Sequence, residues 1–150
     1  SNHEAGTAAV KTRSRFGLAV ALFLAAQPAP AGRLAGYGER QALTISNSGP
    51  ALTNQQVFLD DLAREPAMQS DFADVRFTTA DGETPISYWL VEKQDGIAAD
   101  FYLNVPAIAA SPTQTTVYLY WGHAAAVSAS DYDGTMRKLA ATGAGGPLAL

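Results

Sequence analysis

Six short runs of β-forming residues, separated by turn-forming residues, most restrict how this chain can fold. Apolar and polar side chains alternate in them, as Leu43 and Ile45 do with Thr44 and Ser46, and this period of two belongs to a strand with one buried face. The runs span residues 41–46, 55–60, 74–78, 86–92, 100–106 and 115–121. Together they predict an all-β fold in one domain, an antiparallel β-sandwich of the jelly-roll-like or immunoglobulin-like kind.

The segments outside these runs set the expected domain limits. We expect the sandwich to span residues 40–136, preceded by a glycine-rich and loose lead-in at residues 32–39. Residues 137–150 are rich in alanine and glycine and have no periodicity. They are expected to form a flexible tail or linker.

The start of the chain has the order of parts found in a secretory signal. Three basic residues precede the uncharged apolar run Phe16–Ala26, and a small-x-small pattern at Ala29 and Ala31 follows it. This order predicts a signal peptide over residues 10–31, cleaved after Ala31, with residues 1–9 as a tag or upstream residues.

The alternative for the apolar run is a short amphipathic or buried helix. The run is too short to span a bilayer, which takes about 20 residues. We therefore expect an exported protein, periplasmic or extracellular, with no membrane insertion after cleavage of the signal.

Composition removes several classes of chemistry. The 150 residues include no cysteine, which excludes a disulfide framework, a thiol nucleophile and a cysteine zinc site. Removal of residues 1–31 would leave seven basic and thirteen acidic residues, a net charge of −6. This balance argues against binding to nucleic acid or to an anionic membrane surface, because both depend on lysine and arginine.

Several motifs occur in an order that is typical of one family of secreted domains. They are R-x-x-L-T-I-S-N (40–47), ALTNQQV (51–57), DVRFTTADGETPISYWLVE (74–92), FYLNVP (101–106), TTVYLYWGH (115–123) and ASDYDGTM (129–136). On these motifs the region from Arg40 to Met136 resembles the bacterial and archaeal domain of unknown function 2341 (DUF2341).

The resemblance implies an exported β-rich domain and supplies no catalytic residue. Such domains typically follow a signal peptide and often precede a concanavalin-A-like or laminin-G-like lectin domain. Some are fused to proton-channel proteins of the MotA/TolQ/ExbB type. The family more often has Trp where Phe101 or Tyr102 stands, and Asn where His123 stands.

The run TTVYLYW divides its large side chains between two faces of a strand. Val117, Leu119 and Trp121 share one face, and Tyr118 and Tyr120 share the other. We expect the first set to fill the core. Tyr118 and Tyr120 are then expected to lie outward or beneath a covering loop.

Outward-facing rings suggest a candidate glycan-binding face. We predict that it uses Tyr88, Tyr102, Tyr118 and Tyr120, with His123 nearby, because sugars stack on exposed aromatic rings. The alternative is that aromatic residues simply suit a pleated, half-buried surface and form cross-strand pairs. For His123 the alternative is a turn-stabilising role, since no catalytic partner is fixed by the sequence.

Metal and catalytic sites are weakly indicated. Asp131 and Asp133 repeat the start of a calcium loop, but the remaining ligands of such a loop are absent. Carboxylates are numerous, yet nearly all of them fall at expected turns rather than facing each other across a cleft. We therefore predict no metal, no cofactor and no catalytic activity.

The leading expectation is an exported, non-catalytic binding or structural module of the cell envelope that recognises a glycan or an envelope protein. The alternative is a scaffold or sensor part of an ExbB/TolQ-type complex, which works through protein contacts. A glycoside-acting enzyme is the third hypothesis. The oligomeric state is not predicted.

Overall fold

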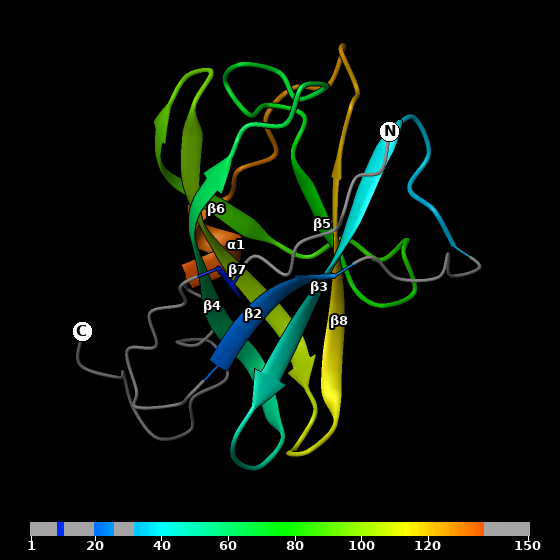
Figure 1. The fold of residues 1–150 in the computed structure, drawn as a ribbon, viewed down its shortest axis with the longest axis vertical. Coiled ribbons are helices and arrows are strands. Elements are labelled where there is room, and N and C mark those ends of the chain that lie inside the picture. Colours follow the sequence, from blue (N-terminus) through cyan, green and yellow to red (C-terminus); the bar gives the residue numbers. More distant parts are fainter. Residues whose placement is uncertain (1–8, 11–19, 26–31, 137–150) are drawn as a thin grey trace.

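Two antiparallel sheets packed face to face make up the protein (Figure 1). The computed structural model describes residues 9–10, 20–25 and 32–136. One sheet has the strand order β1-β2-β3-β8-β5 and the other has the order β4-β7-β6. The elements are β1 (Ala9–Val10), β2 (Val20–Ala25), β3 (Glu39–Asn47), β4 (Leu52–Ala63), β5 (Arg76–Thr78), β6 (Tyr88–Gln94), β7 (Ala98–Ile108), β8 (Gln114–Trp121) and the short helix α1 (Tyr132–Met136). The predicted all-β sandwich is confirmed.

Each of the six predicted runs contains a strand, and four of the strands are longer than predicted. β5 covers only Arg76–Thr78 of the run 74–78, and β6 begins two residues later than the run 86–92. β4 continues to Ala63 through an irregularity, where the pairing with β7 shifts between Leu59 and Leu62. The periodicity could not show this extension, because a β-bulge breaks the alternation of faces. Helix α1 was not predicted either, since five residues are too few for a helical period.

The core lies between the sheets. It is built from the inward-facing side chains of alternate strand positions, among them Leu43, Ile45, Leu59, Phe77, Tyr88, Phe101, Leu103, Val117, Leu119 and Trp121. Full burial of a side chain of this kind stabilises the fold by about 1.5–3 kcal/mol. The predicted inward face of β8 is therefore confirmed.

The first part of the chain is described only at β1 and β2. β2 lies antiparallel to β3, with Val20 opposite Asn47 and Ala25 opposite Ala42. The remaining residues of the predicted signal, and the expected tail at 137–150, fall outside the described residues. Signal cleavage therefore stays a prediction.

The lead-in is packed rather than loose. The Arg40 Nη1 donates to the Gly32 carbonyl at 2.7 Å, and Leu34 and Tyr37 pack on the outer face of β8. Among the described residues, no helix has the length and apolar character needed to cross a membrane.

Candidate functional site

Tyr118 and Tyr120 lie on the outer face of the β3-β8-β5 sheet, but not at the surface. Their side chains are 6% and 0% exposed, because Leu34 and Tyr37 of the lead-in cover them. The Tyr37 ring meets the Tyr120 ring edge-on, with centroids 6.1 Å apart. We call this the covered face.

The polar groups of the covered face are bonded to other groups of the same chain. The Tyr120 hydroxyl donates to the Gly82 carbonyl at 2.7 Å and accepts from the Arg40 Nη1 at 3.0 Å. The Arg40 guanidinium lies 4.8 Å from the centre of the Tyr118 ring. Both tyrosines therefore hold the lead-in in place.

Tyr88 is a core residue. Its ring packs edge-on against Phe77 and Phe101, with centroids 5.4 and 5.9 Å apart. Its hydroxyl accepts hydrogen bonds from the Arg76 Nη1 at 3.3 Å and the Ala129 amide at 3.2 Å. Burial raises the pKa of this phenol above its ordinary value.

The stacking face expected on Tyr88, Tyr118 and Tyr120 is therefore not at the surface. A side chain must be exposed to stack on a sugar, and these three are at most 6% exposed. Of the four predicted tyrosines, only Tyr102 is half-buried rather than buried.

His123 lies beside the covered face and contacts it. Its ring packs against Tyr37, with centroids 5.1 Å apart. Its backbone amide donates to the Asp74 Oδ2 at 3.2 Å. Asp74 is fully buried and also accepts from the amides of Gln69 and Gly122, each at 2.9 Å. These contacts assign His123 and Asp74 to joining the end of β8 to the segment before β5.

The outer face of the β4-β7-β6 sheet carries a second set of aromatic side chains. Phe58 and Trp89 are both paired with Tyr102, each from a neighbouring strand. The Trp89 and Tyr102 rings lie within 10° of parallel, with centroids 6.1 Å apart. The Phe58 ring is 4.8 Å from that of Tyr102, and Tyr132 of α1 meets Trp89 edge-on at 4.8 Å. We call Phe58, Tyr102, Trp89 and Tyr132 the aromatic row.

The aromatic row is accessible to solvent. Phe58, Trp89 and Tyr102 are half-buried, and Tyr132 is 45% exposed. Their neighbours along each strand, such as Tyr88 and Phe101, face the core. The alternation of the strands therefore places one aromatic ring per strand on the open side of this sheet.

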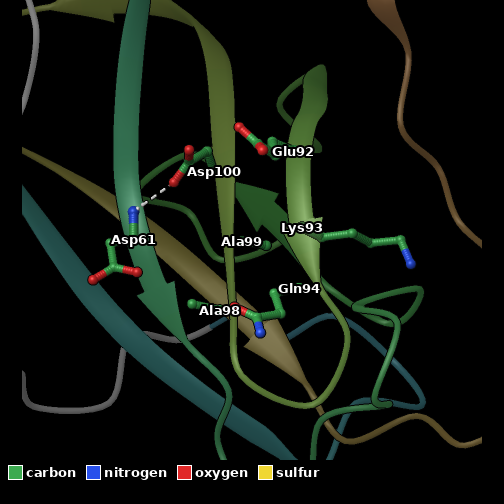
Figure 2. Close-up of a pocket in the computed structure, with 7 residues that line it drawn as sticks. All are labelled: Asp61, Glu92, Lys93, Gln94, Ala98, Ala99 and Asp100. Atoms are coloured by element: carbon green, nitrogen blue, oxygen red, sulfur yellow. Dashed lines mark hydrogen bonds between the residues drawn. The ribbon is translucent and has the colours of Figure 1, made fainter.

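Carboxylates flank the aromatic row on one side. Asp100 lies two residues before Tyr102 on the outer face of β7, and Glu92 lies opposite Asp100 on β6. The Asp61 amide donates to the Asp100 Oδ1 at 2.7 Å, which closes the irregularity in β4. Figure 2 shows these three side chains, which come from three strands, around a shallow hollow of about 180 Å³.

The nearby lysine does not neutralise this group. Lys93 extends away from the carboxylates in Figure 2 and forms an ion pair with Asp95. The hollow is therefore acidic. Within the described part of the chain, no three His, Asp or Glu side chains are grouped so that they could hold a metal ion.

Amides flank the aromatic row on the other side. Gln56 lies opposite Asn104, and its Nε2 donates to the Met136 carbonyl of α1 at 3.1 Å. Asn104 is 3% exposed, and neither its Oδ1 nor its Nδ2 has a hydrogen-bond partner. Such an unpaired amide is unusual in a folded protein.

Asp131 has a structural role at the start of α1. Its Oδ1 accepts a hydrogen bond from the Gly134 amide at 2.9 Å, and its carbonyl accepts from the Thr135 amide at 3.2 Å. These bonds cap the N-terminus of the helix. Asp131 and Asp133, the weak calcium candidates, lie at this helix start and not in a group of metal-ligating side chains.

Residues 71–139 match the family model of a domain of unknown function, DUF2341. The match confirms, over these residues, the resemblance to this family that the motifs predict. The DUF2341 match covers β5 to α1 and includes Trp89, Tyr102 and Tyr132, whereas Phe58 and the motifs at 40–47 and 51–57 lie outside it. No curated protein and no solved structure matches the chain.

The pattern of the sequence missed Phe58 and Trp89 as site residues. Each belongs to the site only through its pairing with Tyr102, and this pairing joins positions far apart in the chain. One signal was present, since each of the three strands carries an aromatic residue next to an inward-facing apolar one. The acidic residues Asp61, Glu92 and Asp100 gave no such signal.

Proposed function

We propose that the protein is an exported, non-catalytic glycan-binding module, and that its ligand lies on the aromatic row. The observation that carries this proposal is the half-exposed pair Trp89 and Tyr102, whose rings lie within 10° of parallel. Phe58 extends the same row onto a third strand.

The chemistry of the neighbouring side chains supports a sugar ligand. A pyranose has apolar C–H faces, which pack on aromatic rings, and a rim of hydroxyl groups. Carboxylates such as Asp100 and Glu92 accept hydrogen bonds from hydroxyl groups, and amides such as that of Gln56 both donate and accept them. A site that offers rings between two polar rows matches both parts of a sugar.

The shape of the site favours binding over catalysis. A hollow of about 180 Å³ is smaller than the pockets of about 300–1,000 Å³ that enclose most small ligands. The aromatic row is an open face, on which a chain of sugar units could extend past the edge of the sheet. We therefore assign Asp61, Glu92 and Asp100 to hydrogen bonding and not to glycoside cleavage.

A glycan array probed with residues 32–150 tests this function. This fragment keeps every residue of the two core clusters that residues 32–136 form. We expect binding to one class of glycan, and its loss in the double variant Trp89→Ala/Tyr102→Ala. Ile97→Ala is the matched control, because Ile97 is 56% exposed and lies outside the aromatic row.

Two results would contradict the proposal. One is an array without any bound glycan. The other is binding that survives in the double variant while circular dichroism shows an intact fold. Release of reducing sugars from a bound glycan would instead favour a glycoside-acting enzyme.

Export is part of the same proposal and is tested separately. The support is the basic, apolar and small-residue order of residues 10–31. N-terminal sequencing of the exported protein should give Gly32 as the first residue. Recovery of the uncleaved chain inside the cell would contradict this expectation.

A further inference from the structure

We propose that strand β3 is an acceptor edge for a strand from another protein. Loss of Val20–Ala25 on signal cleavage frees the outer backbone edge of β3. This edge then binds one extended, uncharged, apolar strand of a partner. The inference rests on the predicted cleavage and does not depend on glycan binding, because β3 and the aromatic row belong to different sheets.

The first observation is the strand that occupies this edge. β2 pairs antiparallel with β3 at six successive positions, from Val20 opposite Asn47 to Ala25 opposite Ala42. In Figure 1, β2 (blue) lies beside β3 (cyan). The edge of β3 therefore fits a strand whose sequence is VALFLA.

Cleavage after Ala31 would remove this occupant and would keep both hydrophobic clusters that the described residues 32–136 form. The most N-terminal of these described cluster residues is Leu34. The lead-in stays attached as well, since the Gly32 carbonyl accepts from Arg40. The processed chain keeps the sandwich and exposes a row of backbone groups along β3 that a second strand can bind.

The second observation is a difference among the edges of the sandwich. Without β1 and β2, the edge strands are β3, β5, β4 and β6. β5 has only three residues. β4 has a bulge at Asp60 and Asp61, and β6 has one near Glu92 beside Lys93. Short strands, bulges and charged residues are the features that prevent edge-to-edge pairing.

Strand β3 has none of these protections over residues 41–47. The stretch QALTISN has no charge and no proline, and its pairing with β8 runs without a shift from Glu39 to Ser46. Leu43 and Ile45 are fully buried, which fixes the register of the strand. Of the edges that the described strands would present after cleavage, β3 is the one suited to strand addition.

The seated strand also indicates the chemistry of the partner. VALFLA is uncharged and entirely apolar, whereas β3 itself carries Glu39, Arg40 and four further polar residues. A second copy of β3 is therefore a poorer match to the strand observed there. We expect the natural occupant to be an apolar segment of an envelope protein.

Disulfide trapping tests the edge directly, because the chain has no cysteine of its own. The protein is residues 32–150 with Ser46→Cys. The probe is a synthetic peptide of residues 17–27 with Ala21→Cys and two added lysines at each end for solubility. Ala21 is the residue opposite Ser46, so the two thiols should meet. A mixed disulfide should form in a glutathione buffer.

The control peptide places the cysteine at Leu24, whose partner is Leu43. Three residues along a strand span about 10 Å, too far for a disulfide. We expect the yield with the Ala21→Cys peptide to be at least about tenfold higher than with the control. The full chain of residues 1–150 with Ser46→Cys should give little product, since its own β2 holds the edge.

Amide hydrogen exchange supplies a second measurement that needs no substitution. The β3 amides should exchange faster in residues 32–150 than in the full chain, and the wild-type peptide should restore their protection. The Trp89→Ala/Tyr102→Ala variant should capture the peptide as well as the parent does, which separates this inference from glycan binding.

Several results would overturn the proposal. They are equal yields with the two peptides, equal capture by the full chain, and unchanged β3 exchange on cleavage. A stable dimer of residues 32–150 through β3 would replace the partner strand by a second copy. An exported protein that retains residues 20–25 would remove the free edge altogether.

Discussion

The two outer faces of the sandwich both carry aromatic side chains, yet only one of them is open. On the covered face, Tyr118 and Tyr120 are buried beneath the lead-in. On the other sheet, Trp89 and Tyr102 are half-buried, and none of the described strands forms a layer over them. The same alternation of inward and outward residues produced both faces.

The two faces differ in the segment that packs over the outer side of each sheet. The lead-in is fixed by the Tyr120 hydroxyl and by Arg40, which together bind Leu34, Gly32 and Gly82. The aromatic row has one short helix at its end and carboxylates beside it. An aromatic ring on the outer face of a sheet therefore stabilises a covering segment in one case and is accessible for binding in the other.

The largest expected effect is on the free energy of unfolding, and it is tested by replacing one residue from each face. Tyr120→Ala should lower the free energy of unfolding by about 3–5 kcal/mol, because it empties a fully buried site. Trp89→Ala should cost only about 1–2 kcal/mol, since its ring is half-exposed and loses mainly its contacts to Tyr102 and Tyr132. Urea unfolding at neutral pH measures both. Equal losses would mean that the aromatic row is structural.

The second prediction tests how the lead-in is held. Gly82 has φ +78°, and a Cβ there would lie 2.3 Å from the Gly32 carbonyl oxygen. Gly96 also has φ +78° but has nothing within 4 Å of an added Cβ. Both substitutions to alanine carry the cost of a left-handed backbone, about 1–2 kcal/mol.

Only Gly82→Ala adds the clash with the lead-in. We therefore expect it to lower the free energy of unfolding by about 1–3 kcal/mol more than Gly96→Ala does. It should also speed amide exchange at residues 34–37. If the two variants lose the same stability, the contact between Gly32 and Gly82 does not hold the lead-in on the covered face.

The fold could be predicted from the sequence because its cause is local. Apolar and polar residues alternate within each strand, which is typical of a strand with one buried face. Several such strands predict sheets that bury one face each. Helix α1 and the bulge at Asp61 could not be predicted, because the first is too short to show a period and the second interrupts one.

The candidate site was less predictable because it depends on contacts between distant residues. Tyr88 and Trp89 are adjacent in sequence, and their order alone did not show which one faces the core. The burial of Tyr118 and Tyr120 depends on Tyr37 and Leu34, more than 80 residues earlier in the chain. Only Tyr102 was both predicted and found on the open face.

The smallest effect concerns the loop that anchors the covered face, and it depends on pH. Hydrogen bonds from the side chain and amide of Thr84, the amide of Glu83 and the hydroxyl of Thr79 hold the pKa of Asp81 well below its ordinary value of 3.8. The folded state therefore keeps this carboxylate ionised at a pH where the unfolded state binds a proton. The stability that Asp81 contributes is complete above about pH 4 and is lost as the pH falls through the folded-state pKa.

Asp81→Asn should therefore destabilise the protein at pH 7 and should weaken its loss of stability between pH 4 and pH 2, where the unfolded wild-type chain binds a proton at Asp81 and the folded state does not. Urea unfolding across this range measures the change. Asp95→Asn, in the other Asp-Gly turn, controls for the loss of one surface carboxylate. If the acid-induced loss is the same in Asp81→Asn as in the wild type, the Asp81 turn does not stabilise the loop through its charge. The cover over Tyr118 and Tyr120 then depends on Gly82 and Arg40 alone, and the difference between the two faces is one of packing rather than of electrostatics.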